Sequence, residues 1–299
     1  MGSFVPMKLF TIPNLFTLGN LFCGCLGIVF AFQGDLVWTA YLVGIAAVLD
    51  FLDGFVARLL KSHSPIGKEL DSLADMVTFG VLPGIVAYRM IQLCIARTGV
   101  EYPEGVFAYL PFIAFLIPLF SGLRLAKFNV DTRQSDSFIG VPTPANAILI
   151  CSIPLILGVD PMFFMGWYHP DLSGPENEAS FMAYLDTHPA VAPGVGNISY
   201  WDVAGAPKIP LIEKILLNVW LHVGISVVMS LLLISEIPLF ALKFKNFGWK
   251  GNEIRYIFLG LSVALFIVLK FVGIPLVIVL YILLSLVNNL LKKKEPAGN

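Results

Sequence analysis

The sequence predicts an all-α fold, a polytopic transmembrane helical bundle with about eight spans. Hydrophobic residues make up 57% of the 299 residues and charged residues only 13%, whereas ordinary soluble domains carry about 25% charged residues. The mean hydropathy is +0.83. The apolar residues are gathered in runs of about 20 residues, the length that an α-helix needs to cross a bilayer. The formal net charge of −1 identifies no class of partner, and no nucleic-acid-binding motif is present.

The predicted spans follow the apolar runs in order along the chain. They cover residues 12–33, 36–60, 69–96, 105–127, 142–159, 212–241, 254–271 and 273–291. The last two belong to one long run, which the sequence Gly273-Ile274-Pro275 interrupts. Because Gly and Pro both disfavour a helix interior, we expect a tight hairpin turn at this point. A simple kink there would instead give seven spans and move the C-terminus to the other side of the membrane.

The distribution of basic residues predicts the orientation of the bundle. Most of the 19 lysines and arginines lie at span ends or in loops on the same side as the N-terminus. With eight spans, the C-terminal residues Lys292, Lys293 and Lys294 join them. Cytoplasmic loops of membrane proteins carry such an excess. We therefore expect a multi-pass protein of the cell (inner) membrane with this side facing the cytoplasm.

Acidic side chains occur at membrane depth in residues 50–75. Asp50 and Asp53 lie late in the second apolar run, and Asp71 and Asp75 lie early in the third. A carboxylate in a membrane helix costs about 2.5–3.5 kcal/mol, so four of them require a common reason. Residues three or four apart share one face of a helix. Two helices joined by a short loop would therefore direct all four carboxylates into one space.

A bound cation is the simplest reason for such a cluster. Hard divalent cations such as Mg²⁺ and Mn²⁺ favour oxygen ligands, and two of them could clamp a transferring phosphoryl group. A set of buried ion pairs is the structural alternative. Cations are few here, however: Arg58, Lys61 and Lys68 are near, and the two lysines lie in the intervening loop. We therefore expect the four aspartates to hold two divalent ions, Mg²⁺ or Mn²⁺.

The spacing of this stretch resembles the signature of the CDP-alcohol phosphotransferase family. The matched positions are Asp50, Gly54, Ala57, Arg58, Gly67, Asp71 and Asp75. The resemblance implies that Asp50, Asp53 and Asp71 are the main metal ligands. It gives Asp75 two roles, contact with the metal and general base for the acceptor hydroxyl. It also implies a homodimer and a CDP-linked lipid as substrate.

The resemblance assigns further residues to that lipid, CDP-diacylglycerol. Members of the family often carry a Pro-Asn start that touches the lipid, matched here by Pro13 and Asn14. Thr17 shares a helix face with Asn14, and helix capping at the membrane entry is the alternative role for both. A hydroxyl residue six positions past the arginine contacts the nucleotide in the family, which indicates Ser64. The full expected set is Asn14, Thr17, Gly54, Ala57, Arg58, Ser64 and Gly67.

A second segment indicates the branch of the family. The run Leu123-Arg124-Leu125-Ala126-Lys127-Phe128-Asn129, followed by Gly140-Val141-Pro142-Thr143-Pro144, resembles the phosphatidylserine synthase branch. Lys127 stands where we would expect arginine. The basic side chains could bind an anion, either the lipid phosphate or the carboxylate of an amino-acid acceptor, or could simply anchor the span at the cytoplasmic side. The candidate acceptor- or phosphate-binding residues are Arg124, Lys127, Asn129 and Arg133.

The resemblance implies a reaction and a division of the chain. A phosphatidyl group would pass from CDP-diacylglycerol to the hydroxyl of L-serine, giving phosphatidylserine and CMP within a membrane whose lipids surround the protein. Glycerol 3-phosphate or inositol as acceptor, a cation-coupled transporter and a purely structural scaffold are the alternatives. Residues 1–159 would form the catalytic core and residues 160–211 an extracytoplasmic insertion. Residues 212–299 would supply the helices that complete the bundle.

Overall fold

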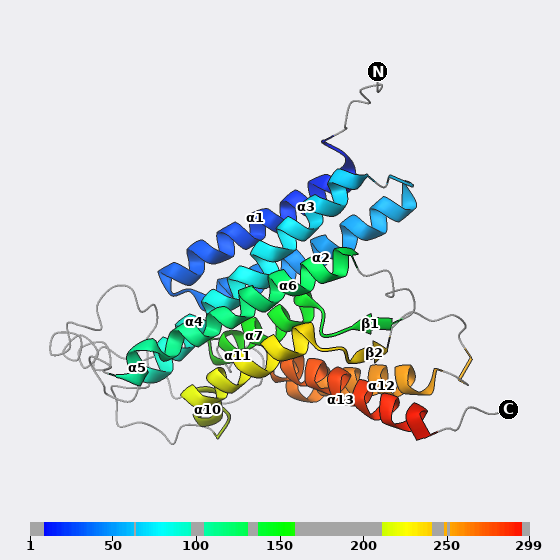
Figure 1. The fold of residues 1–299 in the computed structure, drawn as a ribbon. Coiled ribbons are helices and arrows are strands. Elements are labelled where there is room, and N and C mark those ends of the chain that lie inside the picture. Colours follow the sequence, from blue (N-terminus) through cyan, green and yellow to red (C-terminus); the bar gives the residue numbers. More distant parts are fainter. Residues whose placement is uncertain are drawn as a thin grey trace.

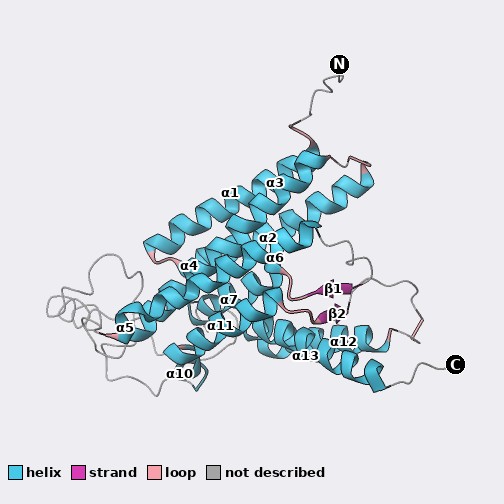
Figure 2. Ribbon diagram, viewed as in Figure 1, coloured by secondary structure: helices cyan, strands magenta, loops and turns pink. Residues whose placement is uncertain are grey.

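The computed structural model describes residues 9–62, 64–96, 105–130, 137–158, 211–240, 248–249 and 252–294. This part of the chain is a bundle of long helices with one short two-stranded ribbon (Figure 1, Figure 2). Five helical segments are long and apolar enough to cross a membrane. Two shorter apolar helices, Thr143–Leu157 and Val219–Ile234, accompany them. The predicted all-α, multi-pass membrane fold is confirmed.

A helical hairpin opens the bundle. Helix α1 (Ile12–Gln33) ends at Gly34, whose φ of 87° is a left-handed conformation that suits glycine. Asp35 then accepts a hydrogen bond from a backbone N–H in the first turn of helix α2 (Leu36–Leu59). The two helices pack against each other. The sequence prediction placed both spans within one residue of these bounds.

The next span is a single long helix with a bulge inside it. Helix α3 (Pro65–Asp75) passes through the π-helical turn η1 (Met76–Val81) into helix α4 (Leu82–Ala96). The predicted span 69–96 is therefore too short at its start. The helix begins earlier because Ser64 caps it, accepting a hydrogen bond from a backbone N–H of the first turn.

Small residues of α1 bring it very close to this long helix. A Cβ atom at Gly24 would lie 2.3 Å from Thr78 Oγ1, and one at Gly27 would lie 2.6 Å from Leu82 Cδ2. Neither distance is tolerated, so only glycine permits this approach. Helices in membranes use small residues in the same way to let their backbones meet. The contact holds α1 against the π-helical turn that follows Asp75.

Two further helical segments follow along the chain. Helix α5 (Val106–Tyr109), the 3₁₀ segment η2 (Leu110–Phe115) and helix α6 (Leu116–Val130) form one continuous span. Strand β1 (Ser137–Ile139) follows, and helix α7 (Thr143–Gly158) returns through the bundle. Both helical segments overlap the predicted spans closely.

The ribbon joins two distant parts of the chain. Helix α10 (Leu211–Leu216) and helix α11 (Val219–Ile234) lead into strand β2 (Pro238–Phe240), which pairs antiparallel with β1. Phe138 lies opposite Leu239 in this pair. A strand pair was not part of the sequence prediction.

The predicted span over 212–241 is wrong in its extent. The helix breaks at Asn218, whose side chain accepts a hydrogen bond from the Trp220 N–H and so starts a new helix. It ends again at Ile234, and the Ser235 backbone that follows is extended. Pro238 cannot continue a helix because its ring removes the backbone donor. The apolar residues beyond Ile234 therefore enter the ribbon instead of the span.

The last apolar run folds back on itself, as predicted. Helix α12 (Glu253–Leu269) passes through the turn η5 (Lys270–Val272) into helix α13 (Gly273–Lys294). A Cβ atom at Gly273 would lie 2.8 Å from the carbonyl oxygen of Leu265, whereas residues eight apart in a straight helix are about 12 Å apart. The chain therefore reverses here, and Figure 1 shows α12 and α13 side by side. The turn lies just before the predicted one.

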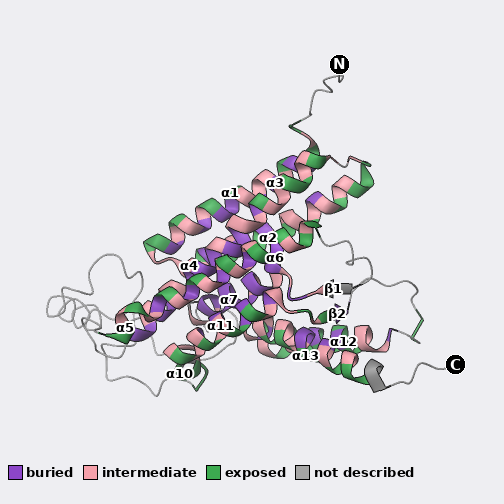
Figure 3. Ribbon diagram, in the orientation of Figure 1, coloured by how far each residue is buried: buried purple, intermediate pink, exposed green. Residues whose placement is uncertain are grey.

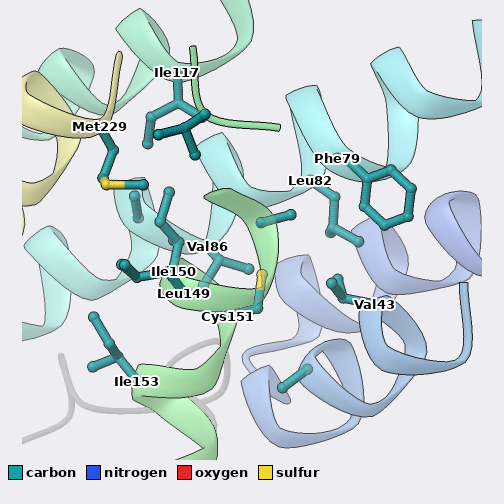
Figure 4. Close-up of a cluster of buried hydrophobic side chains, with 14 of the residues drawn as sticks. Val43, Phe79, Leu82, Val86, Ile117, Leu149, Ile150, Cys151, Ile153 and Met229 are labelled. Atoms are coloured by element: carbon teal, nitrogen blue, oxygen red, sulfur yellow. The ribbon is translucent and has the colours of Figure 1, made fainter. Parts of the chain in front are cut away.

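Helix α7 lies at the centre of the bundle and contacts α2, α4, α11 and α13. Figure 4 shows part of the core around it, where Cys151 and Ile150 of α7 meet Val43, Val86 and Met229. Figure 3 shows buried residues gathered at this centre and exposed residues on the outer faces. Many of those exposed side chains are large and apolar, as expected of helices that face lipid. The predicted insertion at 160–211 lies outside the described residues except at its final position.

Candidate functional site

The four predicted aspartates meet where two helices lie beside α1. Asp50 and Asp53 lie in the last turns of α2, and Asp71 and Asp75 lie at the end of α3. Helix α1 contacts both α2 and α3. Carboxylate oxygens of Asp50, Asp53 and Asp71 lie within 4.8 Å of one another. The side chain of Asp75 comes within hydrogen-bonding range of Asp50, so the fourth acid adjoins the other three.

Helix α1 holds two of these carboxylates through hydrogen bonds. Thr17 Oγ1 donates to Asp53 Oδ2 at 2.7 Å, and Asn20 Nδ2 donates to Asp75 Oδ1 at 3.3 Å. Thr78, in the π-helical turn, donates to the carbonyl oxygen of Asn20 at 3.1 Å. Asn20 was not among the predicted site residues. Its position three residues after Thr17, on the same helix face, is the signal that could have found it.

The cluster carries more negative charge than the described residues neutralise. Within the described part of the chain, no lysine or arginine forms an ion pair with any of the four aspartates. Asp53 is only 8% exposed, and Asp71 Oδ1 is buried without a hydrogen-bond partner. A buried polar group left unpaired costs about 1–3 kcal/mol, and a charged one costs more. Closely spaced carboxylate oxygens are also the ligand set that hard divalent cations prefer. The residues therefore fit a metal ion.

The predicted acceptor residues make different contacts in the structure. Arg124 is buried, and its charge interacts with that of Asp75. Its guanidinium lies 5.8 Å from the centroid of the Phe128 ring. Lys127 instead forms an ion pair with Glu236, beyond the end of α11.

Asn129 makes a second kind of contact, with helix α3. Its Nδ2 donates to Ser72 Oγ at 2.9 Å, and its carbonyl oxygen accepts from Lys68 Nζ at 3.0 Å. These bonds tie the end of α6 to α3. Of the four predicted acceptor residues, Arg124 is the one whose charge interacts with an aspartate, Asp75, and Arg133 falls outside the described residues.

A cavity of about 550 Å³ opens beside the aspartates. Pockets that bind small molecules usually measure about 300–1,000 Å³. All seven residues predicted to bind the CDP-linked lipid line this cavity, together with Asp53 and Asp71. The remaining lining residues are Pro13, Ser62, Pro65 and Lys68. The structure therefore brings the whole predicted lipid set and two of the four acids to one cavity.

Helix capping is the alternative role for Asn14 and Thr17, and other residues cap the helices here. The N-cap of α1 is Thr11, not Asn14 or Thr17. Asn14 Nδ2 donates to the carbonyl oxygen of Leu9 at 2.8 Å, so it fixes the chain before the helix. Ser64 caps α3 as well as lining the cavity. Helix capping and a position in the cavity are thus compatible for this residue.

The cavity lies at the N-terminal end of α3, where backbone N–H groups point outward. Such a helix end attracts phosphate groups through its dipole and its free donors. Arg58 is exposed and extends back along α2, with its Nη1 3.6 Å from where a Cβ of Gly54 would be. Lys68 also lines the cavity. One cavity thus combines an acidic side suited to cations with a basic side suited to phosphate.

Comparison with known proteins agrees with this arrangement. A family model described as CDP-alcohol phosphatidyltransferase matches residues 10–171, more than half of the chain. That range contains the aspartates, the cavity and helix α7.

Curated relatives carry related names. The CDP-diacylglycerol--serine O-phosphatidyltransferase of Helicobacter pylori is 40% identical over 147 residues, which are 48% of this chain and 56% of the relative. The protein of the same name from Bacillus subtilis is 36% identical over 137 residues, 44% of this chain and 69% of the relative. Archaetidylserine synthase of Methanothermobacter thermautotrophicus is 34% identical over 147 residues, 48% and 58% respectively. The match covers roughly half of this chain and little more than half of most of these relatives.

Proposed function

The chain belongs to the CDP-alcohol phosphatidyltransferase family, and we propose that it moves a phosphatidyl group from CDP-diacylglycerol to the hydroxyl of L-serine. The products are phosphatidylserine and CMP. The observation that carries the proposal is a cluster of carboxylates, without a cationic partner among the described residues, at the edge of a cavity that ends on a helix N-terminus. The names of the relatives support serine as the acceptor.

The aspartates are proposed to hold two divalent ions, Mg²⁺ or Mn²⁺. Asp50, Asp53 and Asp71 have the closest oxygens, and Asp75 joins them through its contact with Asp50. Bound divalent ions would neutralise charge on the diphosphate and on the departing CMP. Thr17 fixes the orientation of the Asp53 carboxylate through its hydrogen bond, as residues behind metal ligands commonly do.

The cavity is proposed to hold the CDP part of the lipid. Arg58 offers a planar set of donors that suits phosphate oxygens, and Ser64 stands with it at the start of α3. Gly54 and Ala57 leave the α2 side of the cavity without bulky side chains, so the nucleotide can lie close to that helix. Gly67 likewise leaves the α3 side of the cavity without a side chain. A Cβ atom at this position would lie within 3.1 Å of Ser64 Oγ and Asn14 Oδ1. Asn14 and Thr17 complete the lining from α1.

Asp75 is proposed as the general base. The serine hydroxyl oxygen forms a bond to the phosphatidyl phosphorus while its proton passes to an Asp75 oxygen. The bond between that phosphorus and the oxygen of CMP breaks, and CMP leaves with the electron pair. A positioned base of this kind typically contributes about 10²–10⁴-fold in rate. Asn20 orients the Asp75 carboxylate through its hydrogen bond.

Arg124 is proposed to bind the carboxylate of the incoming serine. It is a buried cation whose charge interacts with that of Asp75, and arginine binds carboxylates with paired hydrogen bonds. Lys127, Asn129 and Arg133 are proposed to contribute to the same acceptor and phosphate region from the end of α6. The ion pair of Lys127 with Glu236 implies that Lys127 acts by attaching α6 to the chain after α11.

The proposed setting is the inner membrane, with the cavity facing the cytoplasm and two chains forming a homodimer. The residues that line the cavity lie at the end of the bundle where α2 finishes and α3 begins, and Figure 1 shows that end of the two helices. Lys61 and Lys68 lie at that end, as the positive-inside rule expects of the cytoplasmic side. The proposed division into a core (1–159), an insertion (160–211) and completing helices (212–299) places every cavity residue in the core.

The test is an acceptor screen with purified protein, CDP-diacylglycerol and Mg²⁺ or Mn²⁺. We expect labelled L-serine to enter lipid with equal release of CMP, and only when divalent metal is present. Use of glycerol 3-phosphate or inositol instead would keep the reaction type and overturn the acceptor. A cation-coupled transporter would release no CMP at all, and neither would a scaffold.

A further inference from the structure

Two buried threonines each form a hydrogen bond to the backbone of helix α1. Thr39 Oγ1, from α2, donates to the carbonyl oxygen of Gly27 at 3.2 Å. Thr78 Oγ1, from the π-helical turn η1, donates to the carbonyl oxygen of Asn20 at 3.1 Å. Both threonines are 0% exposed. The two bonds are chemically alike but end on different turns of α1, so a comparison of the two threonines can separate packing from a part in the reaction.

The bond from Thr78 ends on the residue that contacts Asp75. Asn20 Nδ2 donates to Asp75 Oδ1 at 3.3 Å, while the backbone carbonyl of the same asparagine accepts from Thr78. Asn20 is 0% exposed, and its Oδ1 has no hydrogen-bond partner in the described part of the chain. The amide is therefore aligned by its bond to Asp75 and by the position of its own backbone. Thr78 fixes that backbone position.

Three residues on one face of α1 meet three residues of the long helix that contains Asp75. The pairs, in order, are Asn20 with Asp75, Gly24 with Thr78, and Gly27 with Leu82. The order shows that the two helices run parallel at this crossing, with one contact for each helical turn. A Cβ atom at Gly24 would lie 2.3 Å from Thr78 Oγ1 and 3.1 Å from Thr78 Cα. Thr78 thus lies against α1 at a point where α1 has no side chain.

The turn that carries Thr78 departs from a regular α-helix. The Leu82 N–H donates to the carbonyl oxygen of Val77, five residues before it, whereas an α-helical N–H bonds to the residue four before it. Turns of this kind are rare and are frequent at functional sites. Asp75 directly precedes the turn. The conformation of the turn therefore sets how Asp75 is oriented relative to the helix that follows.

Close packing restricts the same turn on the side of α6. A Cβ atom at Gly80 would lie 3.2 Å from Ser121 Cβ and 3.2 Å from Met76 Sδ. Helix α6 therefore packs directly onto a glycine of the turn. The Thr78 hydroxyl adds a directed bond on the side of α1, so the turn is held from two helices.

We propose that Thr78 is a positioning residue for the reaction: its bond to the Asn20 backbone fixes Asn20, which in turn orients the Asp75 carboxylate. The proposal rests on the proposed function, because that function makes Asp75 the general base. A base must lie within hydrogen-bonding reach of the proton it accepts, about 2.6–3.2 Å. A misplacement of about 1 Å can cost about 10²-fold in rate. Loss of the Thr78 bond should therefore lower turnover more than it weakens lipid binding.

The test compares Thr78→Val with Thr39→Val in purified protein. Each change nearly conserves the volume and removes a buried hydroxyl that bonds to α1, so both should lower the thermal midpoint in detergent to a similar extent. The kcat for CMP release should fall about tenfold in Thr78→Val, near the upper end of what one lost hydrogen bond contributes. It should stay within about twofold of the wild type in Thr39→Val. The KM for CDP-diacylglycerol should change less than about twofold in both, because neither threonine lines the cavity.

Two further variants locate the effect. Thr78→Ser keeps the hydroxyl and should return kcat to within about twofold of the wild type. Asn20→Ala removes the amide that links Thr78 to Asp75. In that background Thr78→Val should cause no further loss of kcat, because residues that act through one another are not additive.

Three results would overturn the proposal. A wild-type kcat in Thr78→Val would mean that the bond has no bearing on the base. Equal losses of kcat in Thr78→Val and Thr39→Val would mean that both threonines only attach helices to α1. An undiminished further loss in the Asn20→Ala background would mean that Thr78 does not act through Asn20. If a valine variant fails to fold, Thr78→Ala and Thr39→Ala provide the same comparison.

The wild-type protein tests the proposed function separately. Wild-type protein that releases no CMP with any acceptor would reject the proposed reaction before any variant is compared. Wild-type turnover together with any of the three contrary results would reject the role of Thr78 and leave the reaction in place.

Discussion

The aspartate cavity and the C-terminal hairpin belong to one apolar bundle but differ in what their polar groups do. In the cavity, acidic side chains gather without cationic partners among the described residues. In the hairpin α12–α13, polar groups are few, and two of them bond to strand β2. Tyr281 donates to the carbonyl oxygen of Phe240 at 2.8 Å, and Asn289 Nδ2 donates to that of Pro238 at 2.7 Å.

This difference indicates that the aspartate cavity carries out the chemistry, whereas the hairpin serves to attach helices to the core. The aspartate cluster lies in the part of the chain that the family model matches, whereas the hairpin lies beyond residue 171. Tyr281 and Asn289 attach the hairpin to strand β2, and only 6% of its most apolar 18-residue stretch is buried. It therefore resembles a lipid-facing support held to the core through the ribbon. Four substitutions can break or sharpen this contrast.

The largest effect is expected from Asp71→Asn. Asp71 contributes an oxygen to the closest group of carboxylates, and an amide is a much poorer ligand for Mg²⁺ than a carboxylate. CMP release should fall below detection at metal concentrations that saturate the wild type. Glu69→Gln is the control, because it removes an exposed carboxylate from the same helix. Wild-type metal dependence in Asp71→Asn would remove it from the ligand set.

Asp75→Asn should be the next most severe. Loss of the proposed base should lower kcat by about 10²–10⁴-fold, while the KM for CDP-diacylglycerol changes little because the cavity lining is intact. Steady-state kinetics with varied lipid separates the two parameters. Unchanged turnover would exclude the base role.

Thr17→Val should produce an intermediate defect. It removes the hydroxyl that donates to Asp53 Oδ2 and nearly conserves the volume. Loss of such a supporting bond typically weakens metal affinity or activity about 10–100-fold, so the metal concentration for half-maximal activity should rise by that factor. Thr39→Val is the control, since Thr39 is equally buried but donates to backbone carbonyls away from the cluster. An identical metal response in both variants would mean that Thr17 has no influence on the site.

The smallest effect on catalysis is expected from Tyr281→Phe in the hairpin. The lost hydrogen bond to Phe240 should lower stability by about 0.5–1.5 kcal/mol, visible as a lower thermal midpoint in detergent. Turnover at low temperature should stay within about twofold of the wild type. A large loss of kcat without a change in stability would show that the hairpin takes part in the reaction.

Much of the site could be predicted because it depends on local spacing. Asp50 and Asp53 share a helix face, as do Asp71 and Asp75, and helical geometry alone converts that spacing into a cluster. Gly54 and Gly67 were identified through the family signature. The cavity lining then followed, since these residues border one loop between two consecutive helices.

The parts that escaped prediction depend on contacts between distant segments. Asn20 reaches Asp75 only because Gly24 lets α1 pack against Thr78, a crossing that the sequence of α1 alone does not reveal. Lys127 pairs with a residue 109 positions away, so its partner could not be inferred from its own helix.

The end of α11 was missed for another reason. Ser235 and Glu236 interrupt the apolar run after Ile234 only briefly, because apolar residues resume at Ile237. Pro238 then prevents the helix from continuing. The chain turns there because strand β1 supplies a partner for β2. The buried polar residues of α7 were likewise hidden in an apolar run.

The most direct measurement of the central claim is Mn²⁺ binding to purified protein, followed by electron paramagnetic resonance with and without CDP-diacylglycerol. If the carboxylates hold cations against the diphosphate, the lipid should tighten Mn²⁺ binding at least about tenfold, since it adds phosphate oxygens to the ligands. Asp71→Asn should lose that gain. Equal Mn²⁺ affinity in the wild type and Asp71→Asn, with no response to CDP-diacylglycerol in either, would contradict the claim.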